Sequence, residues 1–400
     1  MKPYILLLTL ILGAGPWFPE TGRAQSSFDP AIPEMISHVA DSTMLQTIAS
    51  LQSFGTRYSF ASTRDTVARW IKGRFLAAGI TDVVLDGFTY AGVGLANVVA
   101  TIHGTSSSAG EFVVGAHYDS YSPTPYESAP GADDDGSGTS AVIEMARVIS
   151  AYGYVPASTI HFVCFSGEEQ GLQGSYVYAQ RAKNAGRPIR AMLNFDQIGY
   201  RNVGDQQVYL VWYEGGEALA TLGTAVMRLY TTLTPVFITG PRARSDSYSF
   251  ASMEYPAVWW LEYGGLPFYH TTYDRVDFVD GAYAAEIARS ALALLLTLDK
   301  PTTDVHPIAE TLPTAVRLDQ NYPNPFNPTT TITFELPKTS HVTLSVYDPL
   351  GREVSVLLNE RREAGVHEVK FEGSNLASGV YFYRLQAGDY AASKKMLVLK

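Results

Sequence analysis

Stretches of strand length alternate with stretches of helix length over residues 28–300, and this alternation restricts the possible folds more than any other feature of the chain. Apolar residues recur at helical spacing in four segments: 41–54, 62–78, 139–150 and 174–185. Short apolar, β-branched runs occur at 95–102, 112–116, 159–166 and 191–196. Strands that alternate with helices are typical of a parallel sheet between helical layers. We therefore expect an α/β domain over residues 25–300, a three-layer sandwich with a largely parallel central sheet.

The pattern changes after a proline-containing segment, residues 301–316, which we interpret as a linker. Short alternating runs separated by turn residues then follow, at 331–336, 341–347, 366–371, 380–387 and 390–399. Strands of this length and spacing are typical of a β-sandwich. We expect residues 317–400 to form a small all-β, immunoglobulin-like sandwich.

The first 24 residues have the three parts of a secretory signal. Lys2 supplies a positive charge, residues 4–14 form an apolar run, and residues 22–24 end in small residues around Arg23. The apolar run is shorter than the roughly 20 residues of a spanning helix. We therefore predict a signal peptide over residues 1–24, an exported chain and no membrane span after its removal; a buried N-terminal helix is the alternative.

Composition removes several classes of function. The formal net charge is −10, whereas surfaces that bind nucleic acids are usually basic, so we expect no nucleic-acid partner. The single cysteine, Cys164, excludes an intrachain disulfide framework and a cysteine-based zinc or iron–sulfur site. Any metal ion in this chain must therefore be held by histidines and carboxylates.

Acidic residues and histidines follow the predicted strands at the positions where each strand ends. They are His117 and Asp119, the run Asp133–Asp135, the pair Glu168 and Glu169, Asp196, and His270 in a later loop. Taken singly, these residues fit a helix cap, a solvated loop or an ordinary polar histidine. Ligand sites in such sheets lie beyond the carboxyl ends of the strands, where these residues would meet. Two histidines and three carboxylates suit a pair of divalent ions, most naturally zinc.

Five motifs in this order resemble the M28 family of co-catalytic zinc aminopeptidases. They are His-x-Asp at 117–119, Gly-Ala-x-Asp-x-x-Ser-Gly at 131–138, Gly-Glu-Glu-x-Gly-x-x-Gly-Ser at 167–175, Asp196, and the late His270-Thr271. The resemblance covers about residues 35–300 and implies the zinc-exopeptidase type of fold. It also implies two Zn²⁺ ions, with His117 and Asp196 on one ion, Glu169 and His270 on the other, and Asp134 as the bridge.

The same resemblance implies roles for the neighbouring acids and a substrate. Glu168 would be the general base and acid beside the metals, and Asp119 would support His117. We expect Asp133 and Asp135 to be loop and cap residues. The reaction would be hydrolysis of N-terminal residues from peptides with a free N-terminus, through a zinc-activated bridging water.

The chain departs from the family where relatives commonly have Ser-Asp-His, because Ser247 replaces the histidine. Arg242 and Arg244, just upstream, are our candidates for contacting substrate; solvated loop arginines are the alternative. Tyr269 is a third candidate, together with neighbouring aromatic residues, for an apolar pocket that receives the N-terminal side chain. Core packing is the alternative for these aromatic residues.

Three segments of the C-terminal part resemble the sorting domains of type IX secretion: residues 319–328, 377–381 and 394–399. The resemblance implies the type IX secretion machinery as a partner. It also implies export through the periplasm of a Gram-negative bacterium, followed by release or attachment at the cell surface. A binding or adhesion module is the alternative for such a sandwich.

Other functions remain open for the larger domain. A glutaminyl-peptide cyclotransferase shares most of these motifs but generally uses one zinc ion, and a carboxypeptidase of the same family is also compatible. A non-catalytic surface-binding protein would lack some ligands, whereas all five are present here.

Overall fold

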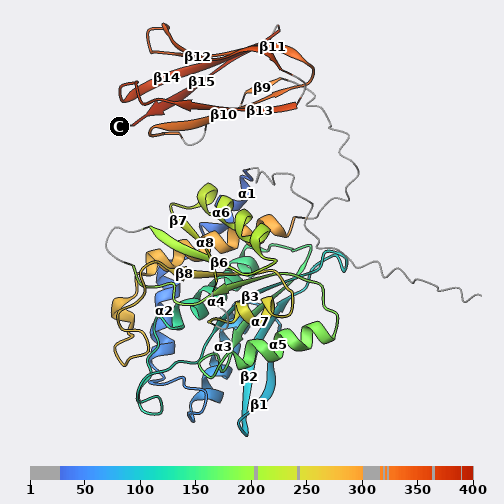
Figure 1. Cartoon of the computed structure of the whole chain (residues 1–400), viewed down its shortest axis with the longest axis vertical. Helices are drawn as coiled ribbons and strands as arrows, with labels where there is room; N and C mark the ends of the chain where they lie inside the picture. Colours follow the sequence, from blue (N-terminus) through green and yellow to red (C-terminus); the bar gives the residue numbers. More distant parts are fainter. Residues whose placement is uncertain are drawn as a thin grey trace, which may run out of the picture. The chain divides into compact units, whose positions relative to one another are not determined.

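The computed structural model describes residues 28–201, 206–240, 244–300, 316–318, 320–321, 324–362, 365–388 and 390–399. The chain divides into two compact units, one up to residue 301 and one from residue 302 (Figure 1). The predicted signal peptide and residues 301–315 of the predicted linker lie outside the described residues.

An eight-stranded mixed sheet forms the middle of the first unit, in the order β1-β2-β4-β3-β5-β8-β6-β7. Its strands are β1 (Asp82–Tyr90), β2 (Val93–Ile102), β3 (Glu111–His117), β4 (Thr159–Phe165), β5 (Ile189–Phe195), β6 (Gln207–Trp212), β7 (Thr234–Thr239) and β8 (Ala257–Glu262). The central strands β4, β3, β5 and β8 are parallel to one another, and β6 is parallel to β7. The pairs β1–β2, β2–β4 and β8–β6 are antiparallel. The expected α/β sandwich with a largely parallel sheet is therefore confirmed.

Helices cover both faces of this sheet, and the apolar core is divided accordingly. One layer contains α1 (Ala31–Ile36), α2 (Asp41–Gln52), α3 (Arg64–Ala77), α4 (Gly136–Tyr152), α6 (Glu217–Tyr230) and α8 (Gly281–Leu298). The other contains α5 (Gln173–Asn184) and the short α7 (Ser247–Ala251). Because both faces are covered, β3 is a nearly continuous apolar run: Phe112 and Val114 pack with the first layer and Val113 with the second.

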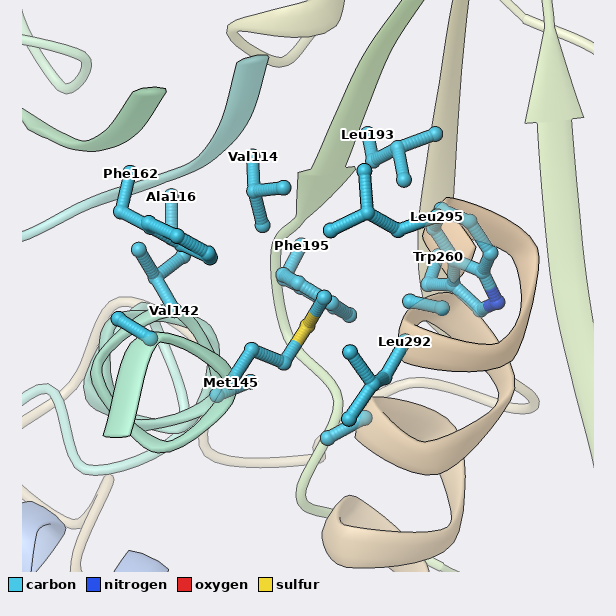
Figure 2. Packing of buried hydrophobic residues seen from close by; sticks show 14 of the residues in the cluster. Val114, Ala116, Val142, Met145, Phe162, Leu193, Phe195, Trp260, Leu292 and Leu295 are labelled. Carbon is cyan, nitrogen blue, oxygen red and sulfur yellow. The ribbon is translucent and has the colours of Figure 1, made fainter. Parts of the chain in front are cut away.

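The thicker layer holds the larger core. Figure 2 shows Met145 of α4 and Leu292 of α8 close to Phe195 of β5, all of them fully buried. Among the described residues, α8 is the one helix long and apolar enough to cross a bilayer, yet 78% of it is buried inside this unit. It contacts α2, α4 and α6, so it is the central helix of the core.

The ends of the observed elements differ from the expected ones by up to three residues, and the structure adds several elements. The predicted helix over 139–150 begins three residues earlier, at Gly136, because Asp135 caps it by accepting a hydrogen bond from the backbone N–H of Gly138 (2.8 Å). We did not anticipate β1, β6, β7 or β8. β1 and β7 are edge strands, whose mixed polar and apolar composition gives a weak strand signal.

The second unit is all-β, as predicted. One sheet has the order β13-β10-β9 and the other β12-β11-β14-β15. The strands are β9 (Arg317–Leu318), β10 (Thr329–Leu336), β11 (Ser340–Tyr347), β12 (Glu353–Arg362), β13 (Gly365–Glu372), β14 (Gly379–Ala387) and β15 (Tyr390–Val398). Phe334 of one sheet and Tyr383 of the other share a single buried core. The unexpected β12 is rich in charged residues and mostly exposed, which explains why its sequence gave little indication of a strand.

We predict that Leu292→Ala destabilises the first unit by about 3 kcal/mol, because it leaves a cavity in a core that cannot close around it. Urea unfolding, monitored by tryptophan fluorescence, measures this loss in the first unit alone, since all five tryptophans precede residue 301. The matched control is Leu76→Ala, whose side chain is 47% exposed. Equal losses for the two variants would contradict this description of the core.

Candidate metal centre

His117 is the last residue of β3, and its ring is held so that one nitrogen faces a group of carboxylates. Its Nδ1 donates a hydrogen bond to the backbone carbonyl of Asp119 (3.1 Å). Its Nε2 lies 3.3 Å from Oδ1 of Asp134 and 3.7 Å from Oδ1 of Asp196. A histidine fixed through one nitrogen presents the other as a lone-pair donor, which is the usual arrangement of a metal ligand.

Asp134 lies between the two histidines and turns one oxygen toward each. Its Oδ2 is 3.2 Å from Nε2 of His270, which also lies 2.9 Å from Oε2 of Glu169. The turn before Asp134 requires a glycine at position 131: φ is +51°, and a Cβ there would lie 2.5 Å from the carbonyl oxygen of Asp134. The structure thus brings together all five residues that the sequence suggested as ligands, with Asp134 in the position of a bridge.

Several oxygens of this group are buried without a hydrogen-bond donor among the described residues. They include Oδ2 of Asp134, Oδ1 of Asp196 and Oε1 of Glu169. A buried carboxylate oxygen that lacks a donor is costly unless a cation neutralises it. Carboxylate oxygens and imidazole nitrogens are ligands that zinc accepts. The residues present therefore fit divalent cations, and they fall into a set around each histidine.

Asp135 also lies close enough to His117 and Asp196 to form a metal-binding group with them. Its two oxygens, however, are already occupied by backbone N–H groups: Oδ1 accepts from Gly138 (2.8 Å) and Oδ2 from His117 (3.2 Å). Asp134 has no such bonds and faces both histidines. Asp135 is therefore the helix cap that we expected, and Asp134 is the better candidate ligand.

Asp119 organises the loop that carries the two glutamates. Its Oδ1 accepts hydrogen bonds from the backbone N–H groups of Gly167 (3.0 Å) and Glu168 (3.1 Å), and its Oδ2 accepts from Glu169 (3.3 Å) and the hydroxyl of Ser59 (3.0 Å). Its carboxylate is also 3.7 Å from Nδ1 of His117. The sequence suggested support of His117 alone, whereas the structure adds a second task, fixing the loop at 167–169.

Glu168 lies beside the group without taking part in its close contacts. Its Oε2 is 4.0 Å from Nε2 of His117, and 13% of its side chain is exposed. Burial raises the pKa of Glu168 well above its ordinary value; the charges of Asp196 and Asp246 raise it further, while that of His117 opposes them. A carboxyl that takes up a proton readily and can be reached from solvent suits proton transfer.

Comparison with known proteins identifies two families in this chain. Residues 97–295 match the model of peptidase family M28, and residues 320–399 match that of a secretion system C-terminal sorting domain. The chain therefore contains an M28 peptidase domain followed by a secretion sorting domain. A probable zinc metalloprotease of Pyrenophora teres f. teres is 36% identical over 200 residues, which cover 44% of this chain and 43% of that relative. The matched part is thus less than half of that relative's length.

Other relatives match over a longer part of the chain. A probable leucine aminopeptidase of Arthroderma otae is 29% identical over 292 residues, covering 70% of this chain and 77% of its own. The crystal structure of the LapA aminopeptidase of Legionella pneumophila superposes with a TM-score of 0.62 at 23% identity, over 69% of this chain and 76% of that one. This structural similarity establishes a shared fold for the M28 domain.

Two residues of the M28 domain that the motifs did not identify hold its loops together. Asp274 accepts hydrogen bonds from the backbone N–H groups of Asp133 (2.8 Å) and Asp134 (3.0 Å). Its own N–H bonds to the carbonyl of Thr271 (3.3 Å), which follows His270. Asp274 therefore ties the loop of one candidate histidine to the loop of the bridging candidate.

Arg57 is the second of these residues and is almost fully buried, with 1% of the residue exposed. Its guanidinium donates to the backbone carbonyls of Tyr118 (2.7 Å), Pro130 (2.6 Å) and Gly131 (2.7 Å). Burial lowers the pKa of Arg57, while nearby carboxylates oppose this shift, among them Asp274, Asp135, Asp119 and Asp134. Its bonds go to backbone carbonyls, and a pattern of side chains does not show which carbonyl needs a donor, so the sequence could not indicate its role.

Two of the three candidates for substrate contact, Arg244 and Tyr269, lie among the described residues. Arg242 lies outside the described residues, and Arg244 is exposed directly before the buried Ser245 and Asp246. Tyr269 is 45% exposed, and its ring stacks on that of His270 with the centroids 3.8 Å apart. Trp259 and Trp260, on β8, are buried, and the indole N–H of Trp259 donates to the carbonyl of Asp196 (3.1 Å).

Ser247 occupies the position where relatives commonly have histidine, and it begins α7 in a buried site. Its Oγ lies 3.1 Å from the hydroxyl of Tyr213, a residue that the sequence had not suggested. Burial raises the pKa of Tyr213 to about 12, so its hydroxyl keeps its proton. Where relatives commonly have a histidine, this chain therefore has two uncharged hydroxyls that are hydrogen-bonded to each other.

We predict that the protein without metal loses stability as the pH rises from 5.5 to 8. Burial raises the pKa of Glu169 and of Asp246 to about 7 and that of Asp274 to about 8. Nearby carboxylates raise the pKa of His270 to about 10, against the effect of burial. Over this range the folded state retains protons that the unfolded chain has released, so the free energy of unfolding falls with rising pH.

Thermal unfolding of chelator-treated protein at the two pH values measures this effect. Zinc added at pH 8 should restore the loss, because metal binding replaces the protons and strengthens as the ligands deprotonate. A metal-free protein that is equally stable at both pH values would contradict the expectation that protons neutralise these buried carboxylates when no metal is bound.

Proposed function

We propose that this protein is a secreted, metal-dependent aminopeptidase that binds two Zn²⁺ ions. The observation that carries the proposal is the position of Asp134, which directs one oxygen to each of two histidines. A carboxylate of this kind can bridge two ions about 3.5–4 Å apart, as in two-metal hydrolases. His117 and Asp196 would complete one ion's ligands, and Glu169 and His270 those of the other.

The residues around these ligands have separate tasks. Zinc, when bound, lowers the pKa of a water molecule and polarises the carbonyl of the scissile bond. Glu168 removes a proton from the attacking water and returns it to the leaving amine; its raised pKa and partial exposure support this role. Asp119 holds the backbone of Glu168 and Glu169, so that the base and a ligand keep their relative positions.

The substrate of the proposed enzyme is a peptide with a free N-terminus. Acidic side chains lie beside the proposed metal ligands, and they would attract a cationic α-amine. The relatives named leucine aminopeptidases support an apolar N-terminal residue. Arg244 and Tyr269 remain our candidates for contacts with substrate, together with Arg242.

The sorting domain supports secretion. We assign residues 1–24 to a signal peptide for passage into the periplasm and the C-terminal unit, residues 317–400, to recognition by the type IX secretion machinery. Residues 301–316 would be the linker between this unit and the peptidase domain, residues 25–300. The enzyme would then act outside a Gram-negative cell or at its surface.

We predict that Glu168→Gln lowers kcat by at least a thousandfold while zinc binding changes little. The amide keeps the shape of the side chain but cannot take up the proton of the attacking water, and loss of proton transfer typically costs about 10²–10⁴-fold. The assay measures the release of p-nitroaniline by the purified protein from a panel of aminoacyl-p-nitroanilides, beginning with that of leucine. Metal content is measured by atomic emission.

The matched control is Glu34→Gln, an exposed glutamate on α1. Chelation should abolish wild-type activity and zinc should restore it. Release of p-nitroaniline that resists chelation would refute the proposed metal dependence. Cyclisation of N-terminal glutamine without hydrolysis would instead select the cyclotransferase.

We predict that deletion of residues 317–400 leaves an active enzyme in the periplasm. The two units are compact by themselves, so the peptidase domain should still fold. Fractionation of a Gram-negative host that has type IX secretion, followed by the zinc-dependent assay, shows where the activity lies. Equal activity of the truncated and full-length chains in the medium would mean that the C-terminal unit is not the export signal.

A further inference from the structure

Five aromatic residues from three separate segments of the first unit are connected by ring contacts, and we call them the aromatic rim: Tyr58, Phe60, Tyr90, Tyr121 and Tyr126. Tyr58 lies at the centre, with ring centroids 5.5 Å from Phe60, 6.2 Å from Tyr121 and 5.1 Å from Tyr126. Phe60 in turn stacks on Tyr90 at 6.2 Å. These separations are those of favourable aromatic pairs, so the rings support one another.

The rim is accessible in spite of this packing. Tyr126 is 64% exposed and Tyr121 is 38% exposed. Within the part of the chain that the structure describes, neither hydroxyl makes a hydrogen bond. Large aromatic side chains gathered at a surface are a usual feature of binding sites, because they offer a wide contact area with a polar tip.

The rim begins at the candidate metal centre. The ring of Tyr121 meets that of His270 edge to face, with the centroids 5.2 Å apart. From His270 the row passes through Tyr121, Tyr58 and Phe60 to Tyr90, in four steps of 5.2 to 6.2 Å. A ligand bound at the metal centre and extending along the rim would therefore contact several rings in succession.

The backbone under the rim is held by its own contacts. Thr56, two residues before Tyr58, donates from its hydroxyl to the carbonyl of Pro125 (2.6 Å), next to Tyr126. Thr56 also forms a bridge with Ala129, whose N–H donates to the carbonyl of Gly55 (3.0 Å). The segments that carry Tyr58 and Tyr126 are thus joined to each other, and the rings are in place before a ligand arrives.

The length of the rim indicates which part of a peptide it receives. The substrate of an aminopeptidase has a single residue before the scissile bond, and an extended peptide advances about 3.3–3.6 Å per residue. Four steps between rings exceed the reach of that one residue. A row of this length that starts at the metal centre matches the part of the peptide that follows the scissile bond.

We propose that the aromatic rim binds the leaving part of the peptide, and that it favours aromatic or large aliphatic side chains at the first two positions after the scissile bond. This inference rests on the proposed aminopeptidase activity. It means that the enzyme distinguishes peptides by residues that it does not release in that cycle. Peptides with small polar residues at these positions should be poorer substrates.

The test compares Tyr126→Ala with the wild type on three substrates: Leu-Phe-Phe, Leu-Gly-Gly and leucinamide, which has no residue after the scissile bond. Free leucine is measured for each. For the wild type, kcat/KM should be at least tenfold higher for Leu-Phe-Phe than for Leu-Gly-Gly. In Tyr126→Ala the ratio of kcat/KM for Leu-Phe-Phe to that for leucinamide should fall about fivefold to tenfold, mainly through KM.

The matched control is Tyr176→Ala, since Tyr176 is 45% exposed on α5 and belongs to no ring contact of the rim. It should leave the ratio unchanged. An unchanged ratio in Tyr126→Ala, or equal cleavage of Leu-Phe-Phe and Leu-Gly-Gly by the wild type, would overturn the role of the rim while leaving the aminopeptidase intact. Failure to release leucine from any of the three substrates would instead overturn the proposed activity, and this inference with it.

Discussion

Burial of many carboxylates at one edge of a sheet is the constraint on which the rest of this structure depends. Like charges in a site of low polarity repel one another strongly, so each group must be neutralised or paired. The chain does this in three ways. Asp119, Asp135 and Asp274 accept backbone N–H groups. Burial raises the pKa of Glu262 well above its ordinary value and the neighbouring Asp133 raises it further, so Glu262 stays protonated.

The third way is neutralisation of the remaining carboxylates by cations. Among the described residues, the carboxylates of Asp134 and Glu169 have histidine nitrogens as their close polar contacts, and each retains a buried oxygen without a donor. Arg57 contributes a fixed positive charge nearby, but its guanidinium bonds are all to carbonyls. It therefore offsets the field of the cluster without competing for the oxygens that a metal would need. In this way the residues that stabilise the fold and the residues proposed to bind zinc remain distinct.

Much of this arrangement could be predicted from the sequence, because parallel strands place their carboxyl ends at the same edge of a sheet. His117 ends β3, Asp196 directly follows β5, and Glu169 lies in the loop after β4, so identifying three strands was enough to bring them together. Arg57 and Asp274 could not be found in this way, since their partners are backbone groups of segments remote in sequence. Nor could the rim, whose rings come from three segments and whose contacts depend on loop conformations.

The backbone at the site is held in place by its surroundings. His270 adopts φ of +56°, a conformation that costs a non-glycine residue free energy and persists only where its surroundings impose it. Those surroundings are supplied by Asp274, which bonds to both loops, and by Tyr121 and Tyr269, whose rings contact the imidazole. A residue held from several sides keeps its nitrogen directed at Asp134 whether or not a ligand is present. The contact between Tyr121 and His270 then joins two functions, because a peptide lying on the rim would press on the side chain that we assign to the second zinc ion.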